Sequence, residues 1–109
     1  DRTGLLYHMN FTETKEMRDF RTRLKKSIYI MSLVAWRLNG EDREDALSIR
    51  NLMRELKNKL DKDANLSEFD FTEIYGAIIL GLSILYSSLE NDLVKKDLLN
   101  IQDTLSIGG

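Results

Sequence analysis

Oxygen-bearing side chains fall at every second position between two helix-like segments, at Asp61, Asp63 and Asn65. Carboxylate and amide oxygens at this spacing are the first ligands of a calcium-binding loop. Such a loop also needs glycine at its sixth position for a sharp turn, and glutamate at its twelfth position as a bidentate ligand. Counted from Asp61, these positions hold Leu66 and Thr72, so the turn and the strongest ligand are both absent.

Only the first five residues of this stretch resemble an EF-hand loop. We therefore expect it to bind no metal, and we keep Asp61, Asp63 and Asn65 as an alternative set of metal ligands. The acidic residues that follow, Asp70 and Glu73, have the spacing of a helix N-cap and its capping box. The segment is then the end of one helix and the start of the next.

Two pairs of carboxylates are separated by three residues, Glu41 with Glu44 and Asp70 with Glu73. They resemble the paired ExxE and ExxD motifs that hold magnesium in the all-α nucleotide pyrophosphatases related to MazG. Each pair begins a predicted helix, and antiparallel neighbours would separate these beginnings by about 25 Å at 1.5 Å per residue. We therefore expect these acids to stabilise helix N-termini and not to share a metal.

Basic residues gather in the segment RDFRTRLKK, as Arg18, Arg21, Arg23, Lys25 and Lys26. Phosphate contacts with nucleic acid need a patch of this kind. Acidic residues are interleaved with the basic ones at spacings that allow ion pairs within one helix. The net charge of −2 gives the whole chain no attraction to nucleic acid. A solvent-facing charged surface is the favoured interpretation, and a nucleic-acid-binding regulator is the alternative.

Residue types that build nucleophilic active sites are scarce. The chain has no cysteine, and its single histidine is His8, close to the N-terminus. Its six glycines are scattered and form no phosphate-binding loop. We expect no catalytic residue, no cofactor and no disulfide, with a carboxylate-dependent metal enzyme as the open alternative. A chain without cysteine is typical of a reducing compartment, so we expect a cytoplasmic protein.

Four helices are expected to position these residues. Proline is absent, and apolar side chains recur every three or four residues. Short loops between long helices favour antiparallel neighbours, so the predicted fold is all-α, a four-helix antiparallel bundle. We interpret residues 1–10 as a leader, partly left by cloning because of the His8-Met9 pair, and residues 11–107 as a single helical domain. The predicted helices cover residues 11–39, 43–60, 71–88 and 92–105, with the last two continuous in an alternative interpretation.

The helix ends are expected at residues with capping chemistry. Asp42 and Asp70 are predicted to accept hydrogen bonds from the first backbone N–H groups of their helices. Gly40 is predicted to follow the first helix, since glycine readily adopts a left-handed conformation. Phe69 and Ile74 have the spacing of a hydrophobic staple around the cap of the third helix.

Two segments are apolar nearly all round. The third helix, 71–88, has no charged face after its first turn, so we expect it at the centre of the bundle. The second half of the first helix carries an additional apolar stripe, Tyr29, Leu33 and Trp36. A small bundle cannot easily enclose two such segments, so this stripe is expected to be covered by another molecule. A second copy of the chain is the simplest cover.

These patterns predict a small non-enzymatic interaction or regulatory module, comparable with adaptors, inhibitors and immunity-type proteins. It is expected to act through an apolar helix surface, as a homodimer or on another protein. The predicted contact residues are Tyr29, Leu33 and Trp36, because buried aromatic side chains contribute much of the energy of interfaces. No membrane span is expected, since the longest nearly apolar stretch, 75–86, has about 12 residues against the roughly 20 required.

Overall fold

Four α-helices form in the computed structural model, which describes residues 15–62 and 66–107. The all-α prediction is confirmed, and there is no strand among the described residues. The assignments to a leader at 1–10 and to metal ligands at Asp63 and Asn65 lie outside the described residues. The helices are α2 (Lys15–Arg37), α3 (Gly40–Lys62), α4 (Glu68–Ser88) and α5 (Asp92–Thr104).

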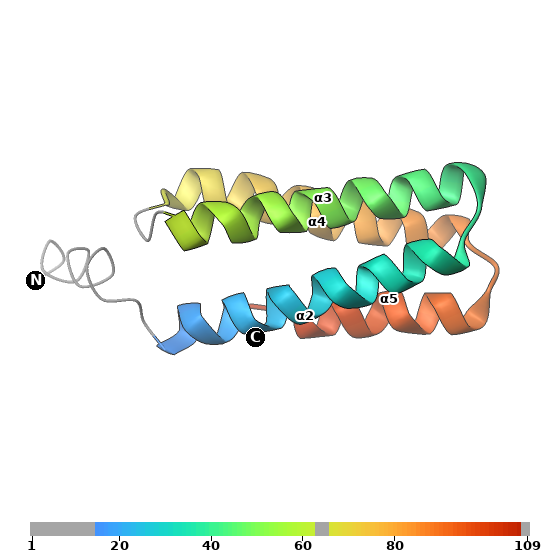
Figure 1. The fold of residues 1–109 in the computed structure, drawn as a ribbon, viewed down its shortest axis with the longest axis horizontal. Coiled ribbons are helices and arrows are strands. Elements are labelled where there is room, and N and C mark those ends of the chain that lie inside the picture. Colours follow the sequence, from blue (N-terminus) through green and yellow to red (C-terminus); the bar gives the residue numbers. More distant parts are fainter. Residues whose placement is uncertain (1–14, 63–65, 108–109) are drawn as a thin grey trace, which may run out of the picture.

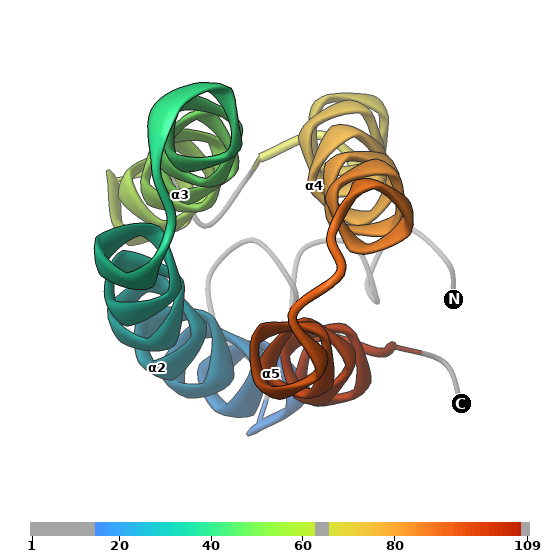
Figure 2. The same ribbon diagram turned by 90° about the vertical axis from the view of Figure 1, so that its right-hand side faces the viewer.

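The helices lie side by side along the length of the molecule, and each begins near the end at which the preceding one stops (Figure 1). Seen end-on, they occupy the corners of a square, with α2 and α4 on one diagonal and α3 and α5 on the other (Figure 2). Both α2 and α4 pack against α3 and α5. The outward sides of α2 and α4 therefore point away from each other.

Each helix contributes an apolar stripe to one core, as its three- and four-residue spacing predicts. At one end of the bundle, the aromatic ring of Phe20 reaches from α2 across the interior toward α4. Its centroid lies 5.5 Å from that of Phe71 and 6.1 Å from that of Tyr75, within the range of favourable aromatic pairs. The largest fully buried side chains include Leu24, Met31, Met53, Leu56, Ile78, Leu82, Leu85, Leu98 and Ile101.

Two helices begin earlier than predicted. Gly40 has φ +55° and makes the turn after α2, as expected, but α3 starts at this same residue. Asp42 therefore lies in the first turn of α3 and is not its cap. The cap of α4 is Ser67, whose side chain accepts a hydrogen bond of 3.0 Å from the backbone N–H of Asp70. Asp70 is thus a first-turn acid that favours the helix N-terminus.

The break between α4 and α5 is real, so the alternative of one continuous helix is wrong. Leu89 has extended backbone angles, and the Asn91 side chain accepts hydrogen bonds from the backbone N–H groups of Leu93 and Val94. The predicted staple at the other end of α4 is also wrong, because Phe69 is exposed to solvent.

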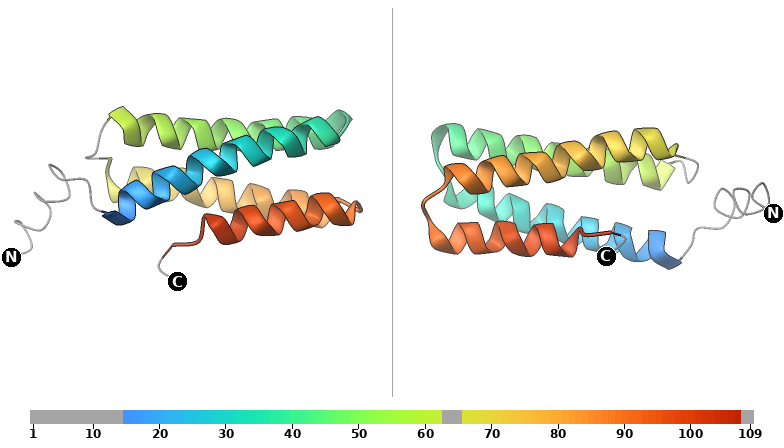
Figure 3. Two further views of the ribbon diagram at one scale, coloured as in Figure 1. Left: turned by 60° about the horizontal axis from the view of Figure 1, so that its bottom comes forward. Right: turned by 180° about the vertical axis from the view of Figure 1, so that it is seen from behind.

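The helix expected at the centre of the bundle, α4, occupies a corner instead. One side of α4 is buried, while Leu80 and Ile84 are 61% and 60% exposed. In the rear view, none of the other described helices lies over α4 (Figure 3, right). Apolar side chains on every side of a helix indicate that burial of each side is favourable. They do not specify whether the same chain or another molecule buries that side.

Candidate interaction surfaces

The outward side of α2 carries three adjacent apolar side chains, Tyr29, Leu33 and Trp36, which we call the α2 patch. They are separated by four and three residues, so they share one side of the helix. Their exposed fractions are 66%, 43% and 79%. The buried residues Leu24 and Met31 belong to the core stripe of the same helix. The surplus apolar surface expected from the sequence is therefore exposed in the single chain.

Arg43 of α3 connects the α2 patch to the rest of the bundle. Its Nε donates a hydrogen bond of 2.9 Å to the Ala35 carbonyl, and its Nη2 donates one of 3.0 Å to the Trp36 carbonyl. Its guanidinium carbon lies 5.9 Å from the Trp36 ring centroid, within the range of a cation–π contact. Trp36 is thus tied to α3 through its backbone and its ring while most of its surface stays exposed. Arg43 was not predicted to have a role, because in the sequence it is only a basic residue early in the following helix.

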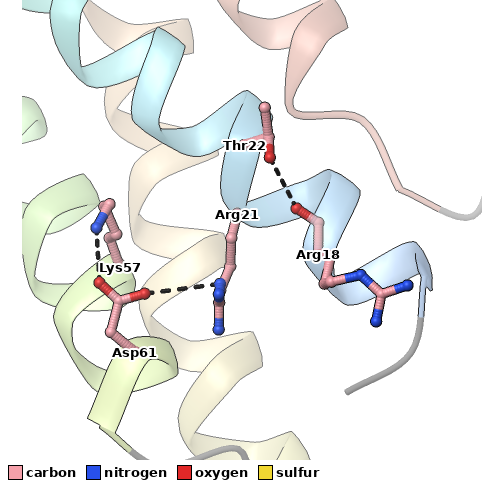
Figure 4. A network of polar contacts seen from close by, with 5 residues as sticks. All are labelled: Arg18, Arg21, Thr22, Lys57 and Asp61. Atoms are coloured by element: carbon pink, nitrogen blue, oxygen red, sulfur yellow. Dashed lines mark hydrogen bonds and ion pairs between the residues drawn. The ribbon is translucent and has the colours of Figure 1, made fainter. Parts of the chain in front are cut away.

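One member of the basic run, Arg21, pairs with α3 (Figure 4). Its Nε lies 3.6 Å from Oδ1 of Asp61, while Lys57 Nζ donates a hydrogen bond of 2.6 Å to Oδ2 of the same carboxylate. The first residue of the calcium-like stretch, Asp61, is therefore already engaged by two cations. This pairing links α2 to the C-terminal end of α3.

A second member of the basic run, Arg23, binds the end of α5. Its Nη1 donates hydrogen bonds of 2.6 and 3.1 Å to the carbonyls of Thr104 and Ser106. A cation at a helix C-terminus satisfies carbonyls that lack partners within the helix. Arg21 and Arg23 thus each contact another helix of the bundle. The other three, Arg18, Lys25 and Lys26, are exposed on α2.

Tyr75 holds the same end of α5 from the side of α4. Its hydroxyl donates a hydrogen bond of 2.8 Å to the Leu105 carbonyl. Burial raises the pKa of Tyr75, and the nearby Arg23 charge and a backbone hydrogen bond with Ile107 partly oppose that rise. The perturbed pKa follows from the packing of α4 against α5, so we assign Tyr75 a structural role.

The described carboxylates are spread over the bundle. Within residues 15–62 and 66–107, no three acidic, histidine or cysteine side chains are placed to hold one ion. Glu41 and Glu44 lie at the start of α3, whereas Asp70 and Glu73 lie at the start of α4, at the other end of the bundle (Figure 1). A hollow of about 420 Å³ on the described surface is lined by polar and charged residues of α3 alone. It therefore has no second wall from another helix.

The outward side of α4 forms a second, largely apolar surface, which we call the α4 face: Phe69, Gly76, Ala77, Leu80 and Ile84, with the acidic Glu73 on the same side near its start. All five residues are exposed, and residues 74–88 contain no charged side chain. Soluble proteins usually place charged and polar residues on the outer side of a surface helix. The α4 face departs from that pattern.

The length and composition of α4 also meet the requirements for a membrane span, with a mean hydropathy of 1.4 over an 18-residue window. The sequence had predicted no membrane span because its longest nearly apolar stretch, 75–86, ends at the serines near the end of the helix. Core helices of soluble proteins satisfy the same criteria, but those helices are mostly buried, and 22% of this window is buried. Most of the apolar surface of α4 is therefore not covered by the rest of the described chain.

Comparison of the chain with protein-family models, curated proteins and solved structures found no match. Any functional proposal therefore rests on the chemistry of the α2 patch and the α4 face.

Proposed function

We propose that this chain is a small non-enzymatic interaction module, an antiparallel four-helix bundle that docks its α2 patch onto a protein partner and self-associates as a homodimer. The supporting observation is Trp36, which is 79% exposed on a packed helix and is tied to α3 by Arg43. Fully burying one large apolar side chain contributes about 1.5–3 kcal/mol. Tryptophan and tyrosine are also the side chains that most often dominate the energy of an interface.

The charges beside the α2 patch indicate the chemistry of the partner. Lys25 precedes Tyr29 by four residues and Arg18 precedes Lys25 by seven, so both share the outward side of α2 with the patch. At about 100° per residue, the acids Glu16 and Asp19 lie roughly 80° or more around the helix from Tyr29. The complementary partner is an amphipathic helix whose apolar stripe is bordered by acidic residues.

The proposal is tested by capture with three immobilised proteins, the wild type, Trp36→Ala and the control Ser48→Ala. Ser48 is exposed on a different helix, α3. Quantitative mass spectrometry of proteins retained from a source-cell lysate should reveal one that the wild type and Ser48→Ala hold equally. We expect Trp36→Ala to reduce its retention at least tenfold, because truncating an interface anchor typically costs 2 kcal/mol or more.

Direct titration of the captured protein then uses Trp36, the single tryptophan of the chain, as a fluorescence reporter. Docking should shift its emission to shorter wavelength and protect it from acrylamide. If the three proteins retain the same set equally, or if Trp36 remains open to quencher in the complex, docking through the α2 patch is wrong.

The alternative function, a nucleic-acid-binding regulator, depends on the exposed Arg18, Lys25 and Lys26. It requires retention on DNA or RNA that weakens steeply as salt rises. Under the favoured proposal, the Lys25→Glu/Lys26→Glu double variant and the wild type both pass a DNA column at low salt. Retention of the wild type together with loss in the double variant would favour the alternative.

A further inference from the structure

A row of arginines on α3 lies beside the α2 patch. Arg43, Arg50 and Arg54 are separated by seven and four residues, so they share one side of α3. That side faces α2, because Arg43 donates hydrogen bonds to two backbone carbonyls of α2. Asp61, seven residues after Arg54, continues the row and pairs with Arg21 of α2 (Figure 4). The row therefore follows the line along which the two helices meet.

The Trp36 ring, 5.9 Å from the Arg43 guanidinium, aligns this row with the α2 patch. Because α3 begins beside the end of α2 (Figure 1), equal steps back along α2 and forward along α3 reach the same level. Steps of seven and then four residues pair a side chain of α2 with an arginine of α3 each time. We call these three pairs the α2–α3 seam: Trp36 with Arg43, Tyr29 with Arg50, and Lys25 with Arg54.

Positive charge is concentrated along the α2–α3 seam, although the chain has a net charge of −2. Among the described residues, Lys25, Arg50 and Arg54 form no ion pair. Arg50 donates a hydrogen bond of 3.3 Å to the neutral side chain of the residue that follows it. Glu44 and Glu55 each follow one of the arginines, so they lie about 100° further round α3, away from its buried stripe. The seam is therefore a positive strip beside an exposed apolar patch.

We infer that the α2–α3 seam binds an acidic amphipathic helix of the partner, whose apolar stripe contacts the α2 patch and whose carboxylates pair with Arg50 and Arg54. This inference rests on the docking through the α2 patch in the proposed function, and it adds residues of α3 that determine specificity. Arginine suits this role because its planar guanidinium donates paired hydrogen bonds to a carboxylate. A basic partner is rejected, since like charges that meet across an interface are costly.

The spacing along the seam favours a helix over a nucleic-acid strand. Steps of seven and four residues match the repeat at which one helix presents side chains to another, so carboxylates on successive turns of a partner can reach Arg50 and Arg54. Leu33, 43% exposed within the α2 patch, adds aliphatic surface between the two rings. Aliphatic surface packs against the apolar stripe of a helix, whereas single-stranded nucleic acids stack their bases on aromatic rings.

The length of the seam limits the strength of this contact. Arg18 continues the row of Lys25 toward the start of α2, and from Arg18 to Trp36 the row extends about 27 Å at 1.5 Å per residue. A helix about 10–12 Å wide that lies between α2 and α3 covers roughly 400 Å² of this chain. Stable interfaces bury about 800 Å² on each partner, and smaller ones are transient. We therefore expect a Kd of tens of micromolar.

Fluorescence anisotropy with two labelled peptides tests the inference. Each peptide consists of three heptads with leucine at positions a and d. One carries glutamate at positions e and g, and the other carries lysine there. The wild type should bind the glutamate peptide at least tenfold more tightly than the lysine peptide. Rising salt should weaken this binding, because exposed charges are screened.

The double variant Arg50→Glu/Arg54→Glu should reverse the preference and bind the lysine peptide at least tenfold more tightly than the glutamate peptide. Misfolding does not produce tighter binding, so the reversal is informative even though Arg50 is half-buried. Arg54→Glu alone, at an exposed position, should shift both affinities in the same directions. The control Lys59→Glu/Lys62→Glu makes the same change in net charge at exposed positions outside the seam, and it should match the wild type.

Two outcomes separate this inference from the docking on which it rests. If the wild type and Arg50→Glu/Arg54→Glu bind both peptides equally while Trp36→Ala weakens both, docking through the α2 patch stands and the role of the arginines is wrong. If Trp36→Ala binds the glutamate peptide as the wild type does, docking through the α2 patch is wrong, and the inference fails with it.

Two further outcomes concern the occupant. A wild type that binds neither peptide would overturn the inference, whereas the proposed function would still be decided by the captured protein. A labelled oligothymidine that the wild type binds more tightly than the glutamate peptide, and that Arg50→Glu/Arg54→Glu does not bind, would assign the seam to nucleic acid and would also overturn the inference.

Discussion

Among the residues that the structure describes, Ser27 is the one polar residue of the buried core. Its hydroxyl is fully inaccessible to solvent and has no hydrogen-bond partner among the described residues. Ser27→Ala removes this unsatisfied group and raises helix propensity, so the free energy of unfolding should rise by about 1 kcal/mol. Urea denaturation followed by circular dichroism measures the change. A loss of stability would mean that the hydroxyl has a partner, such as a buried water.

Tyr75 should make the stability sensitive to alkaline pH. Burial raises its pKa above the ordinary value of 10.0. As the pH increases, the unfolded chain therefore loses this proton before the folded chain does. The Tyr75 contribution to the free energy of unfolding should be constant below about pH 10 and should decrease above it.

Tyr75→Phe is the matched variant. It should lower stability by roughly 1 kcal/mol at neutral pH, through loss of the hydrogen bond to Leu105. Its free energy of unfolding should then decline less than that of the wild type between pH 9 and pH 11. Equal declines in urea titrations at these pH values would contradict the role given to Tyr75.

At the scale of one element, the two glycines of α4 can be compared by substituting each with alanine. Gly76→Ala and Gly81→Ala gain the same helix propensity, about 1 kcal/mol. Only Gly76→Ala should realise this gain, because the new Cβ of Gly81→Ala would lie 3.0 Å from Ile49. Thermal unfolding at protein concentrations low enough to keep the chain monomeric measures both variants. A larger gain for Gly81→Ala would contradict the packing of α4 on α3.

The positions of the helices were largely predictable from the sequence, because apolar spacing alone marks each buried stripe. The start of α4 was misplaced because Ser67 and Asp70 are both good caps, and Ser67 with an acid three residues later is itself a capping pattern. The central position assigned to α4 failed for a different reason. An apolar composition indicates that burial of the helix surface is favourable. Atoms of the same chain and atoms of another molecule can bury that surface equally well.

The α2 patch was also predictable, since it follows from an excess of apolar residues on one helix. Arg43 was not, because its role depends on what lies next to it in space. Arg43 meets Trp36 only because the chain turns at Gly40.

At the scale of the whole molecule, the alternating direction of the helices separates the two pairs of carboxylates that begin α3 and α4. The starts of α3 and α4 lie at opposite ends of the bundle, and Asp61 is paired with Lys57 and Arg21. We therefore expect millimolar calcium, magnesium or manganese to leave the melting temperature unchanged, because a ligand stabilises only a fold that binds it. Differential scanning calorimetry with and without each ion is the measurement. An increase of several degrees would restore a metal site to consideration.

The diagonal placement of α2 and α4 has a consequence for assembly. A homodimer of the proposed kind, joined away from α2, would carry two exposed Trp36 side chains, one for each of two targets. Such a pair is bivalent. Targets that are themselves clustered or repeated would be held by avidity, with an apparent affinity well above that of a single contact.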